Sequence, residues 1–407
     1  MSSSAPGSPV RSEGGDPWFG FDPRRPEIRN DPYPAMNRLR ELSPVHRAPP
    51  GYYRVARYAD VARILREVKA GVRTTAGKLP FTDESMFERT FMLQRDPPDH
   101  TRLRKLVSRA FSVPAINRMQ REIEVLVSRL LDEIEKKSEM DVIADLALPL
   151  PSEVICKMMG VPLSDREKFT VWTAQATHGL LGELAEPDVQ ARALAAAMSL
   201  ADYFDRLIVK RENDLGDDLV SALVRAEADG DKLSGQELLT QLIGLLIAGF
   251  ETTIGLIGNG VRQLLLHGAE LEKFRRRPEL VDRAVEECLR FDGPILATRR
   301  VLHEDVVIGG VPIPKNSTVD VLLGAAHRDP SVFPDPDRFD VERDPNPHFA
   351  FGGGIHYCLG AQLARVEARA AIGALVTRFP RLRLVSTSVE WGPSVFRVPA
   401  RLPVTIA

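Results

Sequence analysis

The sequence 351-FGGGIHYCLG-360 surrounds Cys358 with glycines and precedes residues 361–378, an amphipathic run with helical periodicity. We therefore expect the sulfur near a helix N-terminus, where unpaired N–H groups and the helix dipole favour thiolate over thiol. Glycines lack side chains, so a flat, bulky ligand can approach the backbone closely. An anionic sulfur that faces a planar ligand suggests the axial ligand of a haem iron.

Three other interpretations of this loop compete with haem ligation. A phosphate-binding loop would need a preceding strand and a following Lys-Ser/Thr or acidic residue, and none is evident. A Cys–His nucleophile is chemically possible, but His356 and Cys358 are neighbours in one loop without an evident third orienting group. A buried structural cysteine is the commonest fate of a free cysteine, although it would not need three glycines upstream.

The composition is that of an ordinary globular protein, since 43% of the 407 residues are apolar and 27% are charged. A net charge of −2 provides no strong basic field for nucleic acid or an anionic membrane. The most apolar window, residues 242–250, is roughly half a membrane span. Three widely spaced cysteines allow no disulfide framework, as expected for a cytoplasmic protein. We expect residues 1–20, rich in Ser, Gly and Pro, to be a disordered leader and residues 21–407 to form one domain.

Helical periodicity dominates the chain. The expected helices are residues 33–42, 58–68, 100–112, 115–136, 142–159, 166–184, 188–212, 217–228, 234–267, 270–276, 278–291 and 361–378. The long helix that begins at Ser234 has a capping-box sequence and would span on the order of 50 Å. Alternating strand patterns occur at residues 52–56, 299–308, 311–323 and 382–406. The sequence therefore predicts one mainly α domain with small β-sheets at its edge.

Polar residues interrupt the long apolar helix at 248-AGFETT-253. Three consecutive polar residues cover about 200° of a helix surface, so at least one should point inward. A buried Glu or Thr without partners costs about 1–3 kcal/mol, and Gly249 destabilises the helix by roughly a further 1 kcal/mol relative to alanine. Glu251 and Thr252 therefore suggest a site for a small ligand and ordered water, although an interhelical polar contact explains the patch equally well.

Two charged segments add to this pattern. His100 and Arg104 share one helical face and could bind carboxylates, although a solvated basic face is the better interpretation in isolation. Glu287 and Arg290 are three residues apart and are expected to pair on a helix, with Arg338 completing a buried ionic cluster. On sequence alone the second segment is an ordinary helix salt bridge.

Taken together and in this order, the four segments resemble the cytochrome P-450 superfamily of haem-thiolate monooxygenases, in its soluble bacterial branch, from about residue 31 onward. The resemblance implies a triangular, mainly helical prism with haem b between the long central helix and the helix after the cysteine loop. It implies that Cys358 is the iron ligand, and that Glu251 and Thr252 form the acid–alcohol pair that delivers protons. Glu287, Arg290 and Arg338 would support the fold. The cofactor-binding residues implied are His100, Arg104, Arg300 and His356 at the haem propionates, with Ala248, Phe351, Gly352 and Gly360.

The implied activity is insertion of one oxygen atom from O2 into a medium-to-large hydrophobic substrate, by hydroxylation or epoxidation. Such substrates include macrolides and other polyketides, terpenoids, steroids and fatty acids, often in secondary metabolism. Only 49 residues follow Cys358, too few for a reductase domain, so electrons are expected from NAD(P)H through a separate ferredoxin and its reductase. An acidic ferredoxin would dock at Arg102, Lys105 and Arg109 of a protein that is expected to be a monomer.

The expected substrate pocket is inferred by family position. Its apolar lining favours a hydrophobic ligand, and the small Gly244 and Ala248 would leave volume for a sizeable one. Each of these residues could equally be part of the core. The pocket residues implied are Phe81, Met86, Phe87, Gly244, Ile247, Ala248, Ile295, Leu296, Val395 and Phe396.

Two further functions stay open. A peroxygenase would use hydrogen peroxide without redox partners, but relatives of that kind usually replace the acid–alcohol pair, which is intact at Glu251 and Thr252. A non-catalytic haem module would sense a gas or recruit a partner enzyme, and retention of Cys358 together with this pair argues against it.

Overall fold

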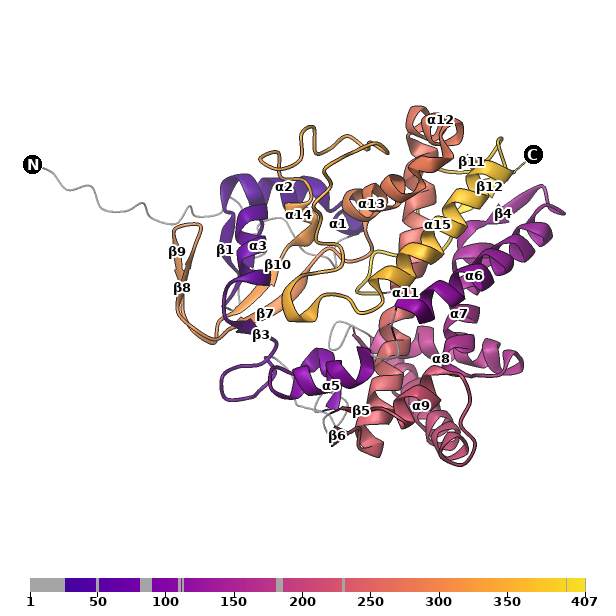
Figure 1. Cartoon of the computed structure of the whole chain (residues 1–407). Coiled ribbons are helices and arrows are strands. Elements are labelled where there is room, and N and C mark those ends of the chain that lie inside the picture. The colour runs from indigo at the N-terminus through magenta and orange to yellow at the C-terminus, as the bar shows by residue number, and fades with distance from the viewer. Residues whose placement is uncertain are drawn as a thin grey trace, which may run out of the picture.

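The computed structural model describes residues 26–48, 51–80, 90–108, 111, 113–180, 186–228, 231–392 and 394–406. Helices dominate the molecule (Figure 1), so the predicted mainly α class is confirmed. The predicted leader, residues 1–20, lies outside the described residues. The helices are α1 (Pro26–Asn30), α2 (Tyr33–Leu42), α3 (Tyr58–Arg66), α5 (Asp99–Ser108), α6 (Val113–Ile134), α7 (Pro149–Met159), α8 (Arg166–His178), α9 (Pro187–Asn213), α10 (Leu219–Val224), α11 (Gly235–Leu266), α12 (Gly268–Arg276), α13 (Val281–Asp292), α14 (Leu323–Ala326) and α15 (Ala361–Arg378).

Small β-sheets join segments that are far apart in the sequence. The largest sheet has the order β1-β2-β10-β7-β3, in which β2 and β10 are parallel and the other pairs are antiparallel. A three-stranded sheet has the order β11-β12-β4, and β5–β6 and β8–β9 form hairpins. The strands are β1 (Val45–Ala48), β2 (Tyr52–Val55), β3 (Ala70–Gly71), β4 (Glu139–Asp141), β5 (Glu227–Ala228), β6 (Asp231–Lys232), β7 (Thr298–Leu302), β8 (Val306–Ile308), β9 (Val311–Ile313), β10 (Thr318–Val321), β11 (Arg383–Leu384) and β12 (Pro403–Thr405).

Predicted and observed helices differ mainly at their ends, and α2 and α15 have the predicted bounds. The predicted helix 217–228 is too long, because its last residues pair as β5 with β6. The predicted helix 142–159 is divided into a π-helical turn (Ile143–Ala147) and α7, which begins at Pro149. Proline is tolerated in the first turn of a helix but removes a hydrogen bond from a helix interior. The strands β1, β3 and β4 were not predicted, since two to four residues show no clear alternation.

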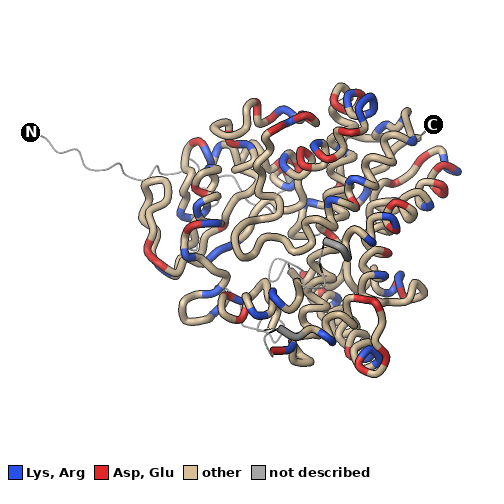
Figure 2. Tube along the Cα trace, in the orientation of Figure 1, with Lys and Arg blue, Asp and Glu red and all other residues tan. Residues whose placement is uncertain are grey.

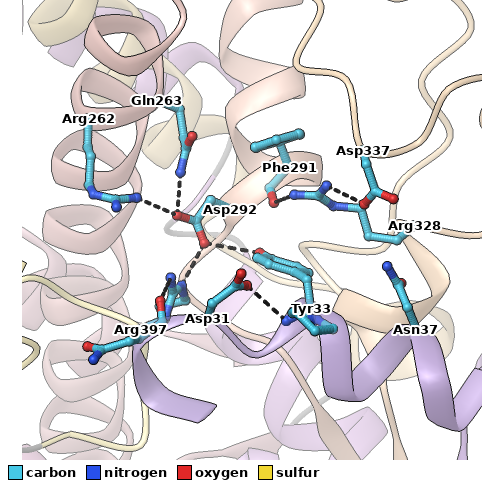
Figure 3. A pocket seen from close by; sticks show the side chains of 12 residues that line it. Asp31, Tyr33, Asn37, Arg262, Gln263, Phe291, Asp292, Arg328, Asp337 and Arg397 are labelled. Carbon is cyan, nitrogen blue, oxygen red and sulfur yellow. Dashed lines mark hydrogen bonds and ion pairs between the residues drawn. The ribbon is translucent and has the colours of Figure 1, made fainter. Parts of the chain in front are cut away.

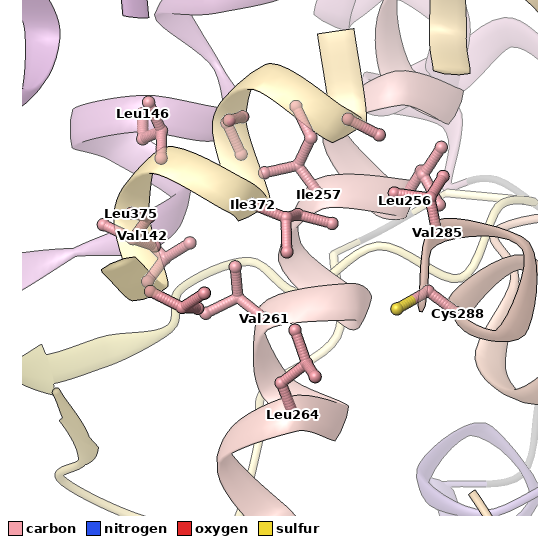
Figure 4. Packing of buried hydrophobic residues seen from close by; sticks show 14 of the residues in the cluster. Val142, Leu146, Leu256, Ile257, Val261, Leu264, Val285, Cys288, Ile372 and Leu375 are labelled. Carbon is pink, nitrogen blue, oxygen red and sulfur yellow. The ribbon is translucent and has the colours of Figure 1, made fainter. Parts of the chain in front are cut away.

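Helix α11 runs through the centre of the molecule (Figure 1). Its capping box forms as predicted: the Glu237 N–H donates to Ser234 Oγ at 3.2 Å, and the Ser234 N–H donates to Glu237 Oε2 at 2.9 Å. In the described part of the chain it is the one helix long and apolar enough to cross a membrane, but 72% of its most apolar window is buried, as in a core helix. Figure 4 shows Ile257 and Val261 of α11 packed with Ile372 of α15 in the main core.

A buried polar network ties the N-terminal helices to α11 and to the C-terminal tail (Figure 3). The Asp292 carboxylate accepts hydrogen bonds from Tyr33 Oη at 3.0 Å, Gln263 Nε2 at 2.7 Å and Arg397 Nε at 2.6 Å. Burial raises the pKa of Asp292, but the charge of Arg397 and these hydrogen bonds prevail and lower it. The adjacent cavity, of about 540 Å³, includes no residue of the cysteine loop in its lining. We therefore assign this network a structural role.

A second buried network holds the segment that leads to the cysteine loop, and it corrects one prediction. Nε and Nη2 of Arg290 each donate to a Glu287 oxygen at 2.7 Å, and both side chains are fully buried. The second arginine is Arg343, whose Nε lies 3.2 Å from Glu287 Oε1. The prediction for Arg338 is wrong: its side chain is 58% exposed, and only its carbonyl oxygen joins the network, accepting from Arg290 and Arg343.

Candidate active site

The cysteine loop, residues 351–360, is held in shape by its own backbone and by α3. The Cys358 N–H donates to the Phe351 carbonyl oxygen at 3.0 Å. Gly352 and Gly354 have φ angles of 72° and 65°, which favour glycine. A Cβ at Gly354 would also collide with the carbonyl oxygen of Leu65 in α3. The conformation of the loop therefore also requires these upstream glycines, in addition to the close approach of a ligand that the sequence predicted. A Cβ at Gly360 would meet no atom within 4 Å.

Cys358 is the one exposed thiol of the chain, because Cys156 and Cys288 are buried. Its position near the start of α15 is as predicted. Solvent reaches the side chain, yet enough protein surrounds it that burial raises the pKa of the Cys358 thiol. A hydrogen bond from the Gly360 N–H and the charges of Arg104 and Arg365 lower this pKa only in part. The helix N-terminus thus does not by itself stabilise a thiolate, whereas coordination to a metal ion would deprotonate the thiol.

Four basic side chains converge on this loop from three elements. The rings of His100 in α5 and His356 have centroids 4.4 Å apart. Arg104, also in α5, donates to the Tyr357 carbonyl oxygen at 2.7 Å, and the charges of Arg104 and of Arg300 in β7 both act on His356. Burial lowers the pKa of His100 to about 4 and also lowers the pKa values of His356, Arg104 and Arg300. The structure therefore brings together the four residues that the resemblance assigns to the propionates.

This cluster fits an anionic ligand. His100 is 2% exposed, and the ring nitrogens of His100 and His356 have no hydrogen-bond partner. Buried polar groups without partners are unfavourable by about 1–3 kcal/mol each, so carboxylates that bind them would stabilise the site. Asp96 does not serve this purpose, because its Oδ1 lies 4.0 Å from His356 Nε2 and its oxygens accept the N–H groups of Val72 and Arg73. The haem propionates implied by the resemblance fit the donors that are present.

The middle of α11 borders an open space. Residues 241–246 are buried, whereas Ile247 and Ala248 are half-buried and Gly249 is exposed. A Cβ at Gly249 would meet no atom within 4 Å. The half-buried Glu251 and Thr252 follow directly, so the residues predicted to act on a ligand lie where the helix leaves the packed core.

Thr252 and Glu251 differ in how their polar atoms are used. Thr252 Oγ1 donates to the Ala248 carbonyl oxygen at 2.9 Å, which leaves its lone pairs to accept a hydrogen bond from a ligand or water. Glu251 Oε2 is buried without a partner, and the carboxyl has a hydrogen bond with Ser394. Burial raises the pKa of Glu251 to about 7, and the Ser394 hydrogen bond offsets it only partly. Such a carboxyl can take up and release protons near neutral pH.

The raised pKa of Glu251 predicts a pH-dependent effect of Glu251→Gln on stability. Below the ordinary pKa of 4.5, the wild-type carboxyl is protonated in both the folded and the unfolded state, and its contribution to stability is fully present. Between pH 4.5 and about 7 it ionises only in the unfolded chain, so this contribution is lost as the pH rises. The glutamine does not titrate, so the variant should gain stability relative to the wild type across this window. Urea denaturation at several pH values measures the difference, and a pH-independent difference would contradict the pKa assignment.

The predicted substrate pocket is only partly compatible with the structure. Ala248 is half-buried next to Gly249, where α11 borders open space, and the half-buried Ile247 also packs on a core cluster. Gly244 does not leave room for a ligand as predicted, because the buried Phe91 ring occupies the position of a Cβ there. Ile295, Leu296 and Phe396 pack on core clusters, and the Val395 side chain is 48% exposed. The other predicted pocket residues, Phe81, Met86 and Phe87, lie outside the described residues.

Arg102, a residue of the predicted ferredoxin surface, forms ion pairs within the protein. Arg102 pairs with Glu237 at the start of α11 and lies 3.3 Å from Asp231, so its charge is already balanced. Lys105 is exposed on the same helix, whereas Arg109 lies outside the described residues. Figure 2 shows acidic and basic residues interspersed along the chain rather than gathered in one region.

Comparisons with known proteins agree with this arrangement. The cytochrome P450 family model matches residues 50–276 and 269–388. The biotin biosynthesis cytochrome P450 of Bacillus subtilis is 40% identical over 386 residues, which are 93% of this chain and 97% of that protein. The structure of the B. subtilis bacillaene polyketide synthase cytochrome P450 PksS has a TM-score of 0.87 and 36% identity, covering 95% of this chain and 100% of that one. The structure of P450BioI in complex with an acyl carrier protein ligated to hexadec-9Z-enoic acid has a TM-score of 0.87 and 38% identity, covering 94% and 99%.

These matches span nearly the whole chain at well over 30% identity, so the fold implied by the resemblance is confirmed. The chain belongs to the cytochrome P450 family and is an oxidoreductase of the haem-thiolate monooxygenase type, which uses haem b and O2 and receives electrons from NAD(P)H through redox partners.

Proposed function

We propose that this monooxygenase inserts one oxygen atom into a medium-to-large hydrophobic substrate, with Cys358 as the iron ligand. The observation that carries the proposal is the combination of an exposed Cys358 with buried basic side chains whose ring nitrogens lack partners. A thiolate-ligated haem supplies oxygen activation, because the sulfur donates electron density that favours O–O cleavage. His100, Arg104, Arg300 and His356 would bind the propionates and fix the haem between the cysteine loop and α11.

Proton delivery is the role we assign to Glu251 and Thr252. The lone pairs of Thr252 Oγ1 can accept a hydrogen bond from a water or ligand beside α11, because its proton is donated to Ala248. Glu251 can relay protons to such a water, because its pKa lies at about 7 and one of its oxygens is free of partners.

Substitution of Thr252 tests this role. In Thr252→Ala, haem binding and NAD(P)H consumption should persist, whereas product formation should fall by about 10²-fold and oxygen should be released as hydrogen peroxide. Product and peroxide per NAD(P)H are measured with a generic ferredoxin system. The matched control is Thr253→Ala, because Thr253 donates to the Gly249 carbonyl oxygen at 3.0 Å in the same manner but is buried. Normal coupling in Thr252→Ala, or equal uncoupling in both variants, would remove the proposed role.

The substrate class we propose is an acyl chain or polyketide. Support comes from two relatives: PksS is named for polyketide biosynthesis, and P450BioI was crystallised with a fatty-acyl carrier protein. The apolar Ala248, next to Gly249 where α11 borders open space, favours a hydrophobic ligand. Optical titration with fatty acids and macrolides, each followed by the Soret shift on displacement of distal water, would distinguish the two classes.

We further propose a cytoplasmic monomer that receives electrons from a ferredoxin. The three free cysteines fit a reducing compartment. The docking surface that we propose lies on α5, where the Lys105 side chain is exposed. Turnover should then decrease as the ionic strength rises.

A further inference from the structure

Two parallel ion pairs connect α13 to α15, the helix that follows Cys358. Arg365 Nε and Nη2 donate to the two oxygens of Glu286 at 2.7 and 2.8 Å. One turn earlier in α13 and one turn later in α15, Arg369 Nη1 donates to Asp282 Oδ1 at 2.5 Å. The first pair is mostly buried, with side chains 28% and 22% exposed, whereas Asp282 is 66% exposed. The two pairs therefore have the same chemistry in different surroundings.

The inner pair lies against the cysteine loop. The Arg365 guanidinium carbon lies 4.4 Å from the centre of the Phe351 ring, and Arg365 Nη1 lies 3.5 Å from the Tyr357 hydroxyl oxygen. The Phe351 carbonyl oxygen in turn accepts the Cys358 N–H, and Tyr357 directly precedes the cysteine. Arg365 therefore contacts the loop on both sides of the hydrogen bond that holds the Cys358 backbone.

Glu286 binds Arg365 through both carboxylate oxygens and also has a hydrogen bond with His348. Burial raises the pKa of Glu286, but hydrogen bonds with Arg365 and His348 outweigh it and lower the pKa to about 2, so the carboxylate is ionised at neutral pH. His348 Nδ1 accepts the Ala350 N–H at 3.2 Å, which means that its proton is on Nε2, 3.0 Å from Glu286 Oε2. The ion pair formed by Glu286 and Arg365 has no net charge, and the His348 hydrogen bond helps to hold the Glu286 carboxylate in place.

We infer that Glu286 is a positioning residue that sets the reduction potential of the haem iron by neutralising Arg365 beside the cysteine loop. Reduction adds one negative charge to the iron site, so a nearby cation without a counter-charge stabilises the reduced form. Glu286 thus keeps the potential more negative than Arg365 alone would set it. This inference rests on the proposed assignment of Cys358 as the iron ligand.

The test is a spectroelectrochemical titration of the substrate-free holoenzyme. Glu286→Gln keeps the shape of the side chain and one acceptor oxygen for His348, and it should shift the potential to more positive values. Arg365→Gln should shift the potential to more negative values, because the carboxylate is then uncompensated. Asp282→Asn should leave the potential unchanged, since its pair is exposed to solvent and lies one turn farther from the loop.

The opposite signs separate an electrostatic effect from a structural defect, which would shift both variants in the same direction. The inference is overturned if Glu286→Gln has the wild-type potential, if Asp282→Asn shifts it equally, or if the two inner variants shift together. If Glu286→Gln loses its haem, the other two variants still test the inference. A reduction potential that is more negative in Arg365→Gln and unchanged in Asp282→Asn supports it, whereas an unchanged potential in Arg365→Gln overturns it. The ferrous carbonyl spectrum of the wild type tests the Cys358 assignment separately, so that the two failures are distinguishable.

Discussion

Glu287→Gln is expected to lower the free energy of unfolding by about 3–5 kcal/mol, because it leaves Arg290 buried without its counter-charge. Both side chains are fully buried and share two hydrogen bonds of 2.7 Å, so water cannot replace the lost carboxylate. Glutamine keeps one acceptor oxygen for the Asp340 N–H, which Glu287 accepts at 2.9 Å, but its NH2 group would face the Arg290 Nε–H, so the segment that leads to the cysteine loop should loosen. Chemical denaturation of the holoprotein measures the change.

Arg338→Gln is the matched control for this prediction. Its side chain is 58% exposed and contributes only a backbone oxygen to the network, so the free energy of unfolding should change by less than about 0.5 kcal/mol. Arg343→Gln should be clearly destabilising, because Arg343 Nε lies 3.2 Å from the Glu287 carboxylate. A destabilisation by Arg338→Gln equal to that of Glu287→Gln would restore the assignment that the sequence suggested.

Cys358→Ser is expected to abolish monooxygenase turnover while the protein stays folded. Serine cannot supply the electron density of a thiolate, and the exposed Cys358 side chain contributes little to the core. Product formation should fall by at least about 100-fold. Loss of a residue that only hydrogen-bonds to a metal ligand can already lower activity by that factor, and loss of the ligand itself should lower it further. Cys156→Ala should retain turnover, because Cys156 is buried in a hydrophobic core cluster. Near-normal product formation by Cys358→Ser would exclude Cys358 as the iron ligand.

The parts of the fold that were predicted correctly have signals within one segment. The capping residues Ser234 and Glu237 and a long apolar run predicted α11, and the glycine-framed Cys358 before an amphipathic run predicted α15. The i and i+3 spacing of Glu287 and Arg290 predicted their pairing. These features depend on neighbours within one or two helical turns, which a sequence displays directly.

Contacts between distant segments could not be predicted. Arg338 and Arg343 lie in the same Pro-rich segment, and only the folded path of the chain decides which one reaches Glu287. Arg102 looked like a surface residue, but its partner Glu237 is 135 residues away. Asp96, which holds the backbone directly after β3 near His356, has no sequence signal for that role.

The effect of small residues on the volume of the candidate pocket could not be predicted from the sequence either. Gly244 suggested space for a substrate, but whether a glycine leaves a cavity depends on what packs against it, here the ring of Phe91. Gly249, in the same helix, does border open space, although the sequence predicted only that it weakens the helix. Packing partners of a glycine lie far away in the chain, so its consequence for pocket volume appears only in the structure.

The ferrous carbonyl spectrum of the purified wild-type protein tests the central claim, that Cys358 binds the haem iron as a thiolate, most directly. We expect a Soret band shifted far to the red, which Cys358→Ser should lose. A correctly folded, haem-loaded wild type whose carbonyl complex lacks this shift would contradict the claim.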